Sequence, residues 1–93
     1  MIIEGSFYRL TPLNDHSPHF DLELLYKVGG KNPRSEFKIA GYGYNLDHAI
    51  KAIIRYAVNQ HFGDQVVTLK QYLDEYRKAA EDIKRSIQDK IDL

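Results

Sequence analysis

The chain has 93 residues, a length that suits one domain and is too short for two. Its 13 basic and 13 acidic residues balance, which excludes a strong overall attraction to nucleic acid or to an anionic membrane. The absence of cysteine excludes disulfides and thiolate metal sites, and no apolar run has the length of a signal peptide or a membrane span. We therefore expect a single domain, residues 1–93, in the cytoplasm.

The first half of the chain has the two-residue period of β-strands. Residues 2–10 are rich in β-forming side chains, and residues 19–28 alternate between apolar and polar side chains, as expected of an antiparallel strand with one buried face. The Gly-Gly-Lys-Asn-Pro turn at residues 29–33 leads to a third strand over residues 35–44. The pattern predicts a three-stranded antiparallel meander.

Two helices are expected after the strands. Asn45 is suited to cap the first helix, which Gly63 would end. Thr68 and Gln71 have the spacing of a capping box for a second, longer helix over about residues 69–91.

The predicted fold class is α+β, a three-stranded antiparallel sheet followed by two helices. Residues 1–62 make up the sheet and the first helix, and residues 64–93 make up the long C-terminal helix. The matching periods of two and 3.6 residues predict one core between the sheet and the first helix. Its expected members are Phe20, Leu22, Leu24, Phe37, Ile39, Ile50, Ile53 and Ala57.

The C-terminal helix has an apolar seam with the three- and four-residue steps of a heptad repeat. The seam consists of Val66, Leu69, Leu73, Tyr76, Ala80, Ile83 and Ile87. At ~1.5 Å per residue the helix is roughly 34 Å long, which exceeds the width that a three-stranded sheet covers. We therefore expect its N-terminal half to pack on its own sheet and its C-terminal half to pair with a second copy in a homodimer. The residues expected at this contact are Tyr76, Ala80, Ile83 and Ile87.

Neither a metal site nor a catalytic centre is indicated. His16 and His19 have a His-x-x-His spacing, but Pro18 prevents a helix from presenting both rings on one face, and a polar loop is favoured. His48 and His61 lie on the first helix and point in different directions. No serine stands in a nucleophile elbow. We expect a protein that is not an enzyme, with no catalytic residues, no metal and no cofactor.

The segment Gly41–Asn45 leads from the third strand into the first helix. Backbone amides there could hold an anion, but the lysine and further glycines of a phosphate loop are missing. Glycines that let the strand bend closely over the helix are the favoured explanation. Tyr42 and Tyr44 are expected to share a face, where aromatic rings can contact a protein partner or stack on bases.

Basic residues gather around the second hairpin. Together with the two tyrosines they form the only stretch similar to a nucleic-acid footprint, but Glu23 and Glu36 dilute the positive charge and favour a solvated hairpin. This surface is the predicted binding site for a protein or, as the alternative, for nucleic acid. Its residues are Tyr42, Tyr44, Lys38, Arg34 and Lys31.

Three predicted strands followed by a helix that opens Gly-Tyr-Asn-Leu-Asp-His-Ala-Ile are similar to two families. Residues 2–62 resemble a HicB-type antitoxin domain, whose third strand also leads through a glycine and a polar cap into an alanine-rich helix. The strands also resemble the DNA-binding arm domain of phage integrases, although Asp21 and Glu23 place acidic side chains on the outside of the sheet. These resemblances imply a regulator that binds nucleic acid.

The chain also looks like the small accessory proteins that phages and mobile elements encode, which are short, cysteine-free, tyrosine-rich and without an enzyme motif. Anti-CRISPR and other anti-defence inhibitors belong to that group. This resemblance implies a protein that binds and occludes a host protein, and it is the function that we expect first. An antitoxin-like, nucleic-acid-binding regulator is the alternative.

Overall fold

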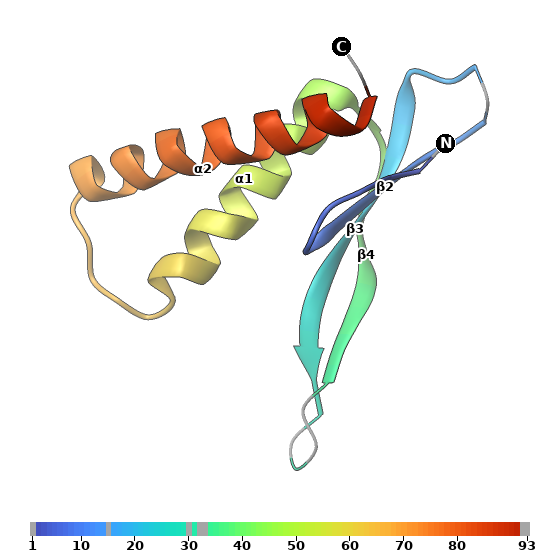
Figure 1. Ribbon diagram of the computed structural model, residues 1–93. Helices are drawn as coiled ribbons and strands as arrows, with labels where there is room; N and C mark the ends of the chain where they lie inside the picture. The colour runs from blue at the N-terminus through green and yellow to red at the C-terminus, as the bar shows by residue number, and fades with distance from the viewer. Residues whose placement is uncertain (1, 15, 30, 32–33, 92–93) are drawn as a thin grey trace. The chain divides into compact units, whose positions relative to one another are not determined.

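The structure is a computed structural model of the chain, in which four strands are followed by two helices (Figure 1). The chain divides into two compact units, residues 1–49 with the sheet and residues 50–93 with most of the helical part. The predicted α+β class is thereby confirmed. The residues that the structure describes are 2–14, 16–29, 31 and 34–91.

The sheet is antiparallel throughout, and its strands lie side by side in chain order. It has four strands where three were predicted. The strands are β1 (Ile3–Glu4), β2 (Tyr8–Pro12), β3 (His19–Val28) and β4 (Arg34–Asn45). β3 and β4 form a long hairpin whose predicted turn, residues 29–33, lies partly outside the described residues (Figure 1).

The extra strand arises because the first predicted strand, residues 2–10, is broken by a tight turn. The N–H of Gly5 donates to the carbonyl of Tyr8 at 2.9 Å. The Tyr8 ring lies against the backbone of Gly5, at a place where any Cβ would overlap it. β1 therefore folds back on β2 as a separate short strand.

The side chains on one face of the sheet, here named the inner face, are buried. Cross-strand pairing places Tyr8 opposite Leu24 and Leu10 opposite Leu22, and paired residues of an antiparallel sheet point to the same side. The predicted alternation is thereby confirmed for Phe20, Leu22 and Leu24. The buried residues of the inner face are Ile3, Tyr8, Leu10, Phe20, Leu22 and Leu24.

Two residues that were predicted for the core lie on the opposite face of the sheet. Phe37 pairs with Leu25 and Ile39 pairs with Glu23, so both side chains point away from the inner face, and Ile39 is 45% exposed. The prediction was wrong because the alternation within β4 leaves open which of its two faces meets the core. Only the register with β3 decides that question.

The first helix begins and ends at the predicted residues. α1 (Leu46–Phe62) is capped by Asn45, whose Oδ1 accepts the N–H of His48 at 2.8 Å. It ends at Gly63, which has a φ of 55° and donates its N–H to the carbonyl of Asn59 at 2.9 Å. A left-handed glycine is a common C-terminal stop. The buried side chains of α1 are Ala49, Ile53, Ile54 and Val58.

The second helix, α2 (Leu69–Ile91), begins with the predicted capping box. The N–H of Thr68 donates to Oε1 of Gln71 at 2.8 Å, and the N–H of Gln71 donates to Oγ1 of Thr68 at 3.1 Å. Both bonds satisfy amides that the helix itself leaves without an acceptor. Within the described residues, neither helix is long and apolar enough to cross a membrane.

The apolar seam of α2 is exposed at its start and buried towards its end, the reverse of the predicted arrangement. Leu69 and Leu73 are 73% and 48% exposed, whereas Ile83 and Ile87 are 6% and 2% exposed. The two seam residues between these pairs are partly buried. Ile83 and Ile87 therefore need no second copy to be removed from water. Homodimerisation itself stays a prediction.

Candidate interaction surface

Besides Ile2 and Leu13, the large apolar side chains that are exposed in the described part of the chain fall into two groups. Single exposed apolar residues are common on protein surfaces, but neighbouring ones indicate contact sites. The first group consists of Ile39 and Tyr42 on β4. The second group consists of Val66, Leu69 and Leu73 at the start of α2.

The first group lies on the face of the sheet opposite the inner face, here named the outer face. Arg9 of β2 pairs with Glu23 of β3, and Glu23 pairs with Ile39 of β4, so one row of outward side chains crosses three strands. Leu25 and Phe37 form the neighbouring pair on the same face. The residues of the outer face are Glu4, Arg9, Thr11, Asp21, Glu23, Leu25, Lys27, Ser35, Phe37, Ile39 and Tyr42.

Arg9 joins the charged and aromatic parts of the outer face. The central carbon of its guanidinium lies 4.1 Å from the centre of the Phe37 ring, a cation–π contact. Its Nη2 lies 2.8 Å from a carboxylate oxygen of Glu4, and its Nη1 lies 3.5 Å from one of Glu23. These contacts orient the Phe37 ring and offset the charge of the arginine with two carboxylates. The outer face therefore combines aromatic and aliphatic side chains with an arginine whose charge is offset, and Lys27 adds one exposed lysine near the end of β3.

A bulge in β4 brings Tyr42 to the outer face. The register between β3 and β4 shifts on both sides of Leu22. Between Phe20 and Leu22, and again between Leu22 and Glu23, β4 has one residue more than β3. Gly43 at the first bulge has a φ of 66° and donates its N–H to Oδ1 of Asp21 at 3.1 Å. Tyr42 follows Gly41, which pairs with the buried Leu22, and therefore points to the other side of the sheet, where it is 73% exposed.

The same bulge separates Tyr42 from Tyr44, which were predicted to share a face. Tyr44 pairs with Phe20 of the inner face and is partly buried. Its ring lies against the backbone of Gly41, where a Cβ would overlap it. Residues two apart in a regular strand point the same way, but the extra residue of a bulge breaks that alternation. The prediction of a single tyrosine face is therefore wrong.

The basic part of the predicted site is likewise divided. Lys38 is exposed but pairs with Leu24 of the inner face, so it does not adjoin Tyr42 on the outer face. Nη2 of Arg34 lies 2.7 Å from a carboxylate oxygen of Glu36, which offsets its charge. Lys31 is exposed in the loop between β3 and β4. Whether any of these residues contacts a partner stays a prediction.

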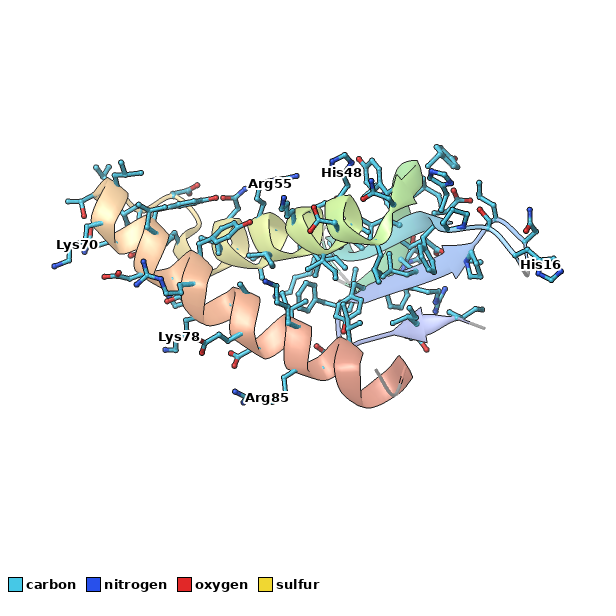
Figure 2. The ribbon with its side chains drawn as sticks, turned by 90° about the horizontal axis from the view of Figure 1, so that it is seen from above. His16, His48, Arg55, Lys70, Lys78 and Arg85 are labelled. Atoms are coloured by element: carbon cyan, nitrogen blue, oxygen red, sulfur yellow. The ribbon has the colours of Figure 1, made fainter. Side chains whose placement is uncertain are left out.

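The histidine-containing loop between β2 and β3 has the hydrogen bonds of a polar turn. The N–H of His16 donates to Oδ1 of Asn14 at 2.9 Å, and the N–H of His19 donates to Oγ of Ser17 at 3.1 Å. Figure 2 shows the His16 side chain pointing away from the strands. Asp15, the third member of the motif, lies outside the described residues. No group of three or more potential metal ligands gathers in the part of the chain that the structure describes.

Sequence reasoning missed Arg9 and Phe37 as members of the candidate surface. Arg9 stands between two apolar residues of a strand, and this alternation could have marked it as outward-facing. Its contact with Phe37 joins residues far apart in the chain, and no local pattern indicates such a pairing.

Comparison of the chain with protein-family models, with curated proteins and with solved structures gives no match. The resemblances to HicB-type antitoxin domains, to integrase arm domains and to phage accessory proteins therefore stay predictions. Any functional conclusion has to come from the chemistry of the surfaces themselves.

Proposed function

We propose that this protein works by binding another protein through the outer face of its sheet, and that it catalyses no reaction. The observation that carries the proposal is the exposure of Tyr42 (73%) and Ile39 (45%) on the face that also holds the Arg9–Phe37 stack. Tyrosine and arginine are over-represented among the residues that dominate protein–protein binding energy. Tyrosine also adds a large contact area at a low cost in side-chain entropy.

The charges of the outer face favour a protein partner over nucleic acid. Arg9 is already in contact with Glu4 and Glu23, and Asp21 lies opposite the bulge at Tyr42. A nucleic-acid backbone laid on this face would meet three carboxylates and a single exposed lysine, Lys27, whereas its affinity depends on several unpaired lysines and arginines. The alternative is an antitoxin-like regulator that binds nucleic acid. It would have to use the basic residues of the hairpin, Lys31, Arg34 and Lys38.

Occlusion is the mechanism that such a surface supports. An aromatic and aliphatic patch with paired charges can cover a functional surface of its partner without doing chemistry. The resemblance to anti-CRISPR and other anti-defence proteins supports a host defence protein in the cytoplasm as the target. Self-association through α2 is a separate prediction, which the molar mass from light scattering tests.

The proposal is tested by measuring the affinity for a partner captured from a host-cell lysate and then purified. Tyr42→Ala is expected to weaken binding by at least about ten-fold, the effect typical of a residue that dominates an interface. Arg55→Ala is the control, because Arg55 is exposed on α1 and belongs to neither the outer face nor the predicted basic site. Unchanged affinity in Tyr42→Ala would contradict the proposal. Capture of DNA or RNA, with binding that weakens steeply as salt rises, would favour the alternative.

A further inference from the structure

The second group of exposed apolar residues, here named the α2 stripe, consists of Val66, Leu69 and Leu73. They are 101%, 73% and 48% exposed. Val66 lies in the loop before α2, whereas Leu69 and Leu73 belong to the seam that becomes buried further along the helix. Leu69 and Leu73 are four residues apart, so they lie one above the other on one side of α2. Neighbouring exposed aliphatic residues of this kind indicate a contact surface rather than scattered solvent exposure.

One flank of the α2 stripe is formed entirely by basic residues. Lys70, Arg77 and Lys84 recur at seven-residue spacing, so they lie in one row along the helix, directly beside the seam. All three are exposed, and Lys70 and Arg77 form no ion pair with any residue that the structure describes. Figure 2 shows Lys70 pointing outward at the start of α2. This row is available to negatively charged groups.

The other flank of the α2 stripe is occupied by the end of α1. The ring of Phe62 stacks on that of Tyr72 with their centres 6.4 Å apart. Nε2 of His61 lies 3.7 Å from a carboxylate oxygen of Glu75. Tyr72 and Glu75 are both on the side of α2 opposite the basic row. A partner of the α2 stripe therefore meets Lys70 and Arg77 and not the flank that α1 covers.

A second copy of this chain is a poor occupant of the stripe. Two α2 helices that pair antiparallel bring their open flanks together, which sets Lys70 against Arg77 of the other copy. In a parallel pair, the basic flank of one helix would face the opposite flank of the other helix, which α1 already covers. Like charges facing each other at such a contact destabilise it.

Anionic lipid and nucleic acid also fit less well than a protein helix. Asp74 and Glu81 lie directly beyond the basic row on the helix surface, so a broad anionic surface would meet acidic as well as basic residues. A helix is narrow enough to contact the stripe and the basic row alone. Its own flanking residues would have to be acidic to pair with Lys70 and Arg77.

We propose that the α2 stripe is a second docking surface, and that its partner is an amphipathic helix whose apolar stripe is flanked by acidic side chains. The partner's apolar residues cover Leu69 and Leu73, while its carboxylates pair with Lys70 and Arg77. This surface lies on a different unit of the chain from the outer face of the sheet. The two surfaces can therefore be tested independently.

The test uses two fluorescent synthetic peptides, both with leucine at the a and d positions of three heptads. One has glutamate at the e and g positions and the other has lysine, and both are used below the concentration at which they self-associate. Fluorescence anisotropy with the full chain is expected to show binding of the glutamate peptide only. Lys70→Glu with Arg77→Glu should weaken that binding by at least about ten-fold and allow the lysine peptide to bind. Leu69→Ser with Leu73→Ser should abolish binding of the glutamate peptide.

The matched control is Lys78→Glu with Arg85→Glu, which makes the same charge change on the far side of α2. At about 100° per residue these two residues lie on the side of α2 away from Leu69 and Leu73, so the affinity for the glutamate peptide should stay the same. Figure 2 shows both side chains pointing outward from the helix. Tyr42→Ala should also leave it unchanged, which separates this surface from the outer face of the sheet. Circular dichroism verifies that each variant is folded.

Four results would overturn the proposal. If the chain binds neither peptide, or binds both equally, it does not recognise an acidic helix by its charge. Tighter binding to vesicles of anionic phospholipid than to the glutamate peptide assigns the surface to membranes. A dimer mass by light scattering that Leu69→Ser with Leu73→Ser converts to a monomer assigns it to a second copy.

Discussion

Replacing Gly43 by alanine tests what holds the bulge that places Tyr42 on the outer face. Gly43 has a φ of 66°, in the left-handed region that costs an alanine about 1–2 kcal/mol. A Cβ at this position meets no atom within 4 Å, so steric overlap adds nothing. We therefore expect the free energy of unfolding to fall by about 1–2 kcal/mol. For a chain of this length each kcal/mol lowers the melting temperature by roughly 4–8 °C.

Asp21 provides the second half of this prediction. Its carboxylate accepts the N–H of Gly43 at 3.1 Å on an exposed part of the sheet, so Asp21→Ala should cost about 1 kcal/mol. If an alanine at position 43 relaxes towards a negative φ, this N–H turns away from Asp21. Removal of Asp21 then costs less, and the double variant should lose less than the sum of the single losses by about 0.5 kcal/mol or more.

Urea unfolding followed by circular dichroism measures these free energies. Gly63→Ala is the matched control, because Gly63 has a φ of 55° and equally open surroundings, but its N–H donates to the carbonyl of Asn59. Gly63→Ala should lower the free energy of unfolding by a similar amount. Its loss and that of Asp21→Ala should add up in the double variant to within about 0.5 kcal/mol. Full additivity of Asp21→Ala with Gly43→Ala would refute the coupling. A loss below about 0.5 kcal/mol in Gly43→Ala would refute the conformational argument itself.

Two further predictions concern stability and are checked by the same unfolding measurements. Leu22→Ala removes a side chain that is 0% exposed on the inner face and should cost about 2–5 kcal/mol, whereas Ile39→Ala, at 45% exposure on the outer face, should cost about 1 kcal/mol or less. Equal losses in these two variants would contradict the assignment of the two faces. Thr68→Ala should cost about 1 kcal/mol because it removes the oxygen that accepts the N–H of Gln71, while Thr68→Ser should retain most of that stability. A Thr68→Ala variant as stable as the parent would show that the capping box contributes nothing.

The sequence by itself determined the ends of both helices. Asn45, Gly63 and the pair Thr68 and Gln71 were predicted from residue type and spacing, and each acts where it was expected. These helix ends can be predicted because a helix cap is a hydrogen bond between residues three or four apart, so the residues that form it are close together in the sequence. The alternation of β3 could be recognised for a similar reason, since Phe20, Leu22 and Leu24 on one of its faces are buried.

Only the tertiary structure decided which side chains form the candidate surface. Phe37 and Ile39 lie on the outer face because of the register between β3 and β4, and Tyr42 and Tyr44 point to opposite sides because of a bulge at Gly43. Register and bulges are properties of two paired strands, and a shift of one residue reverses the face of every side chain beyond it. The period of a single strand carries no information about that shift. The same limit applies to α2, whose seam is uniform in sequence although its start is exposed and Ile83 and Ile87 are buried.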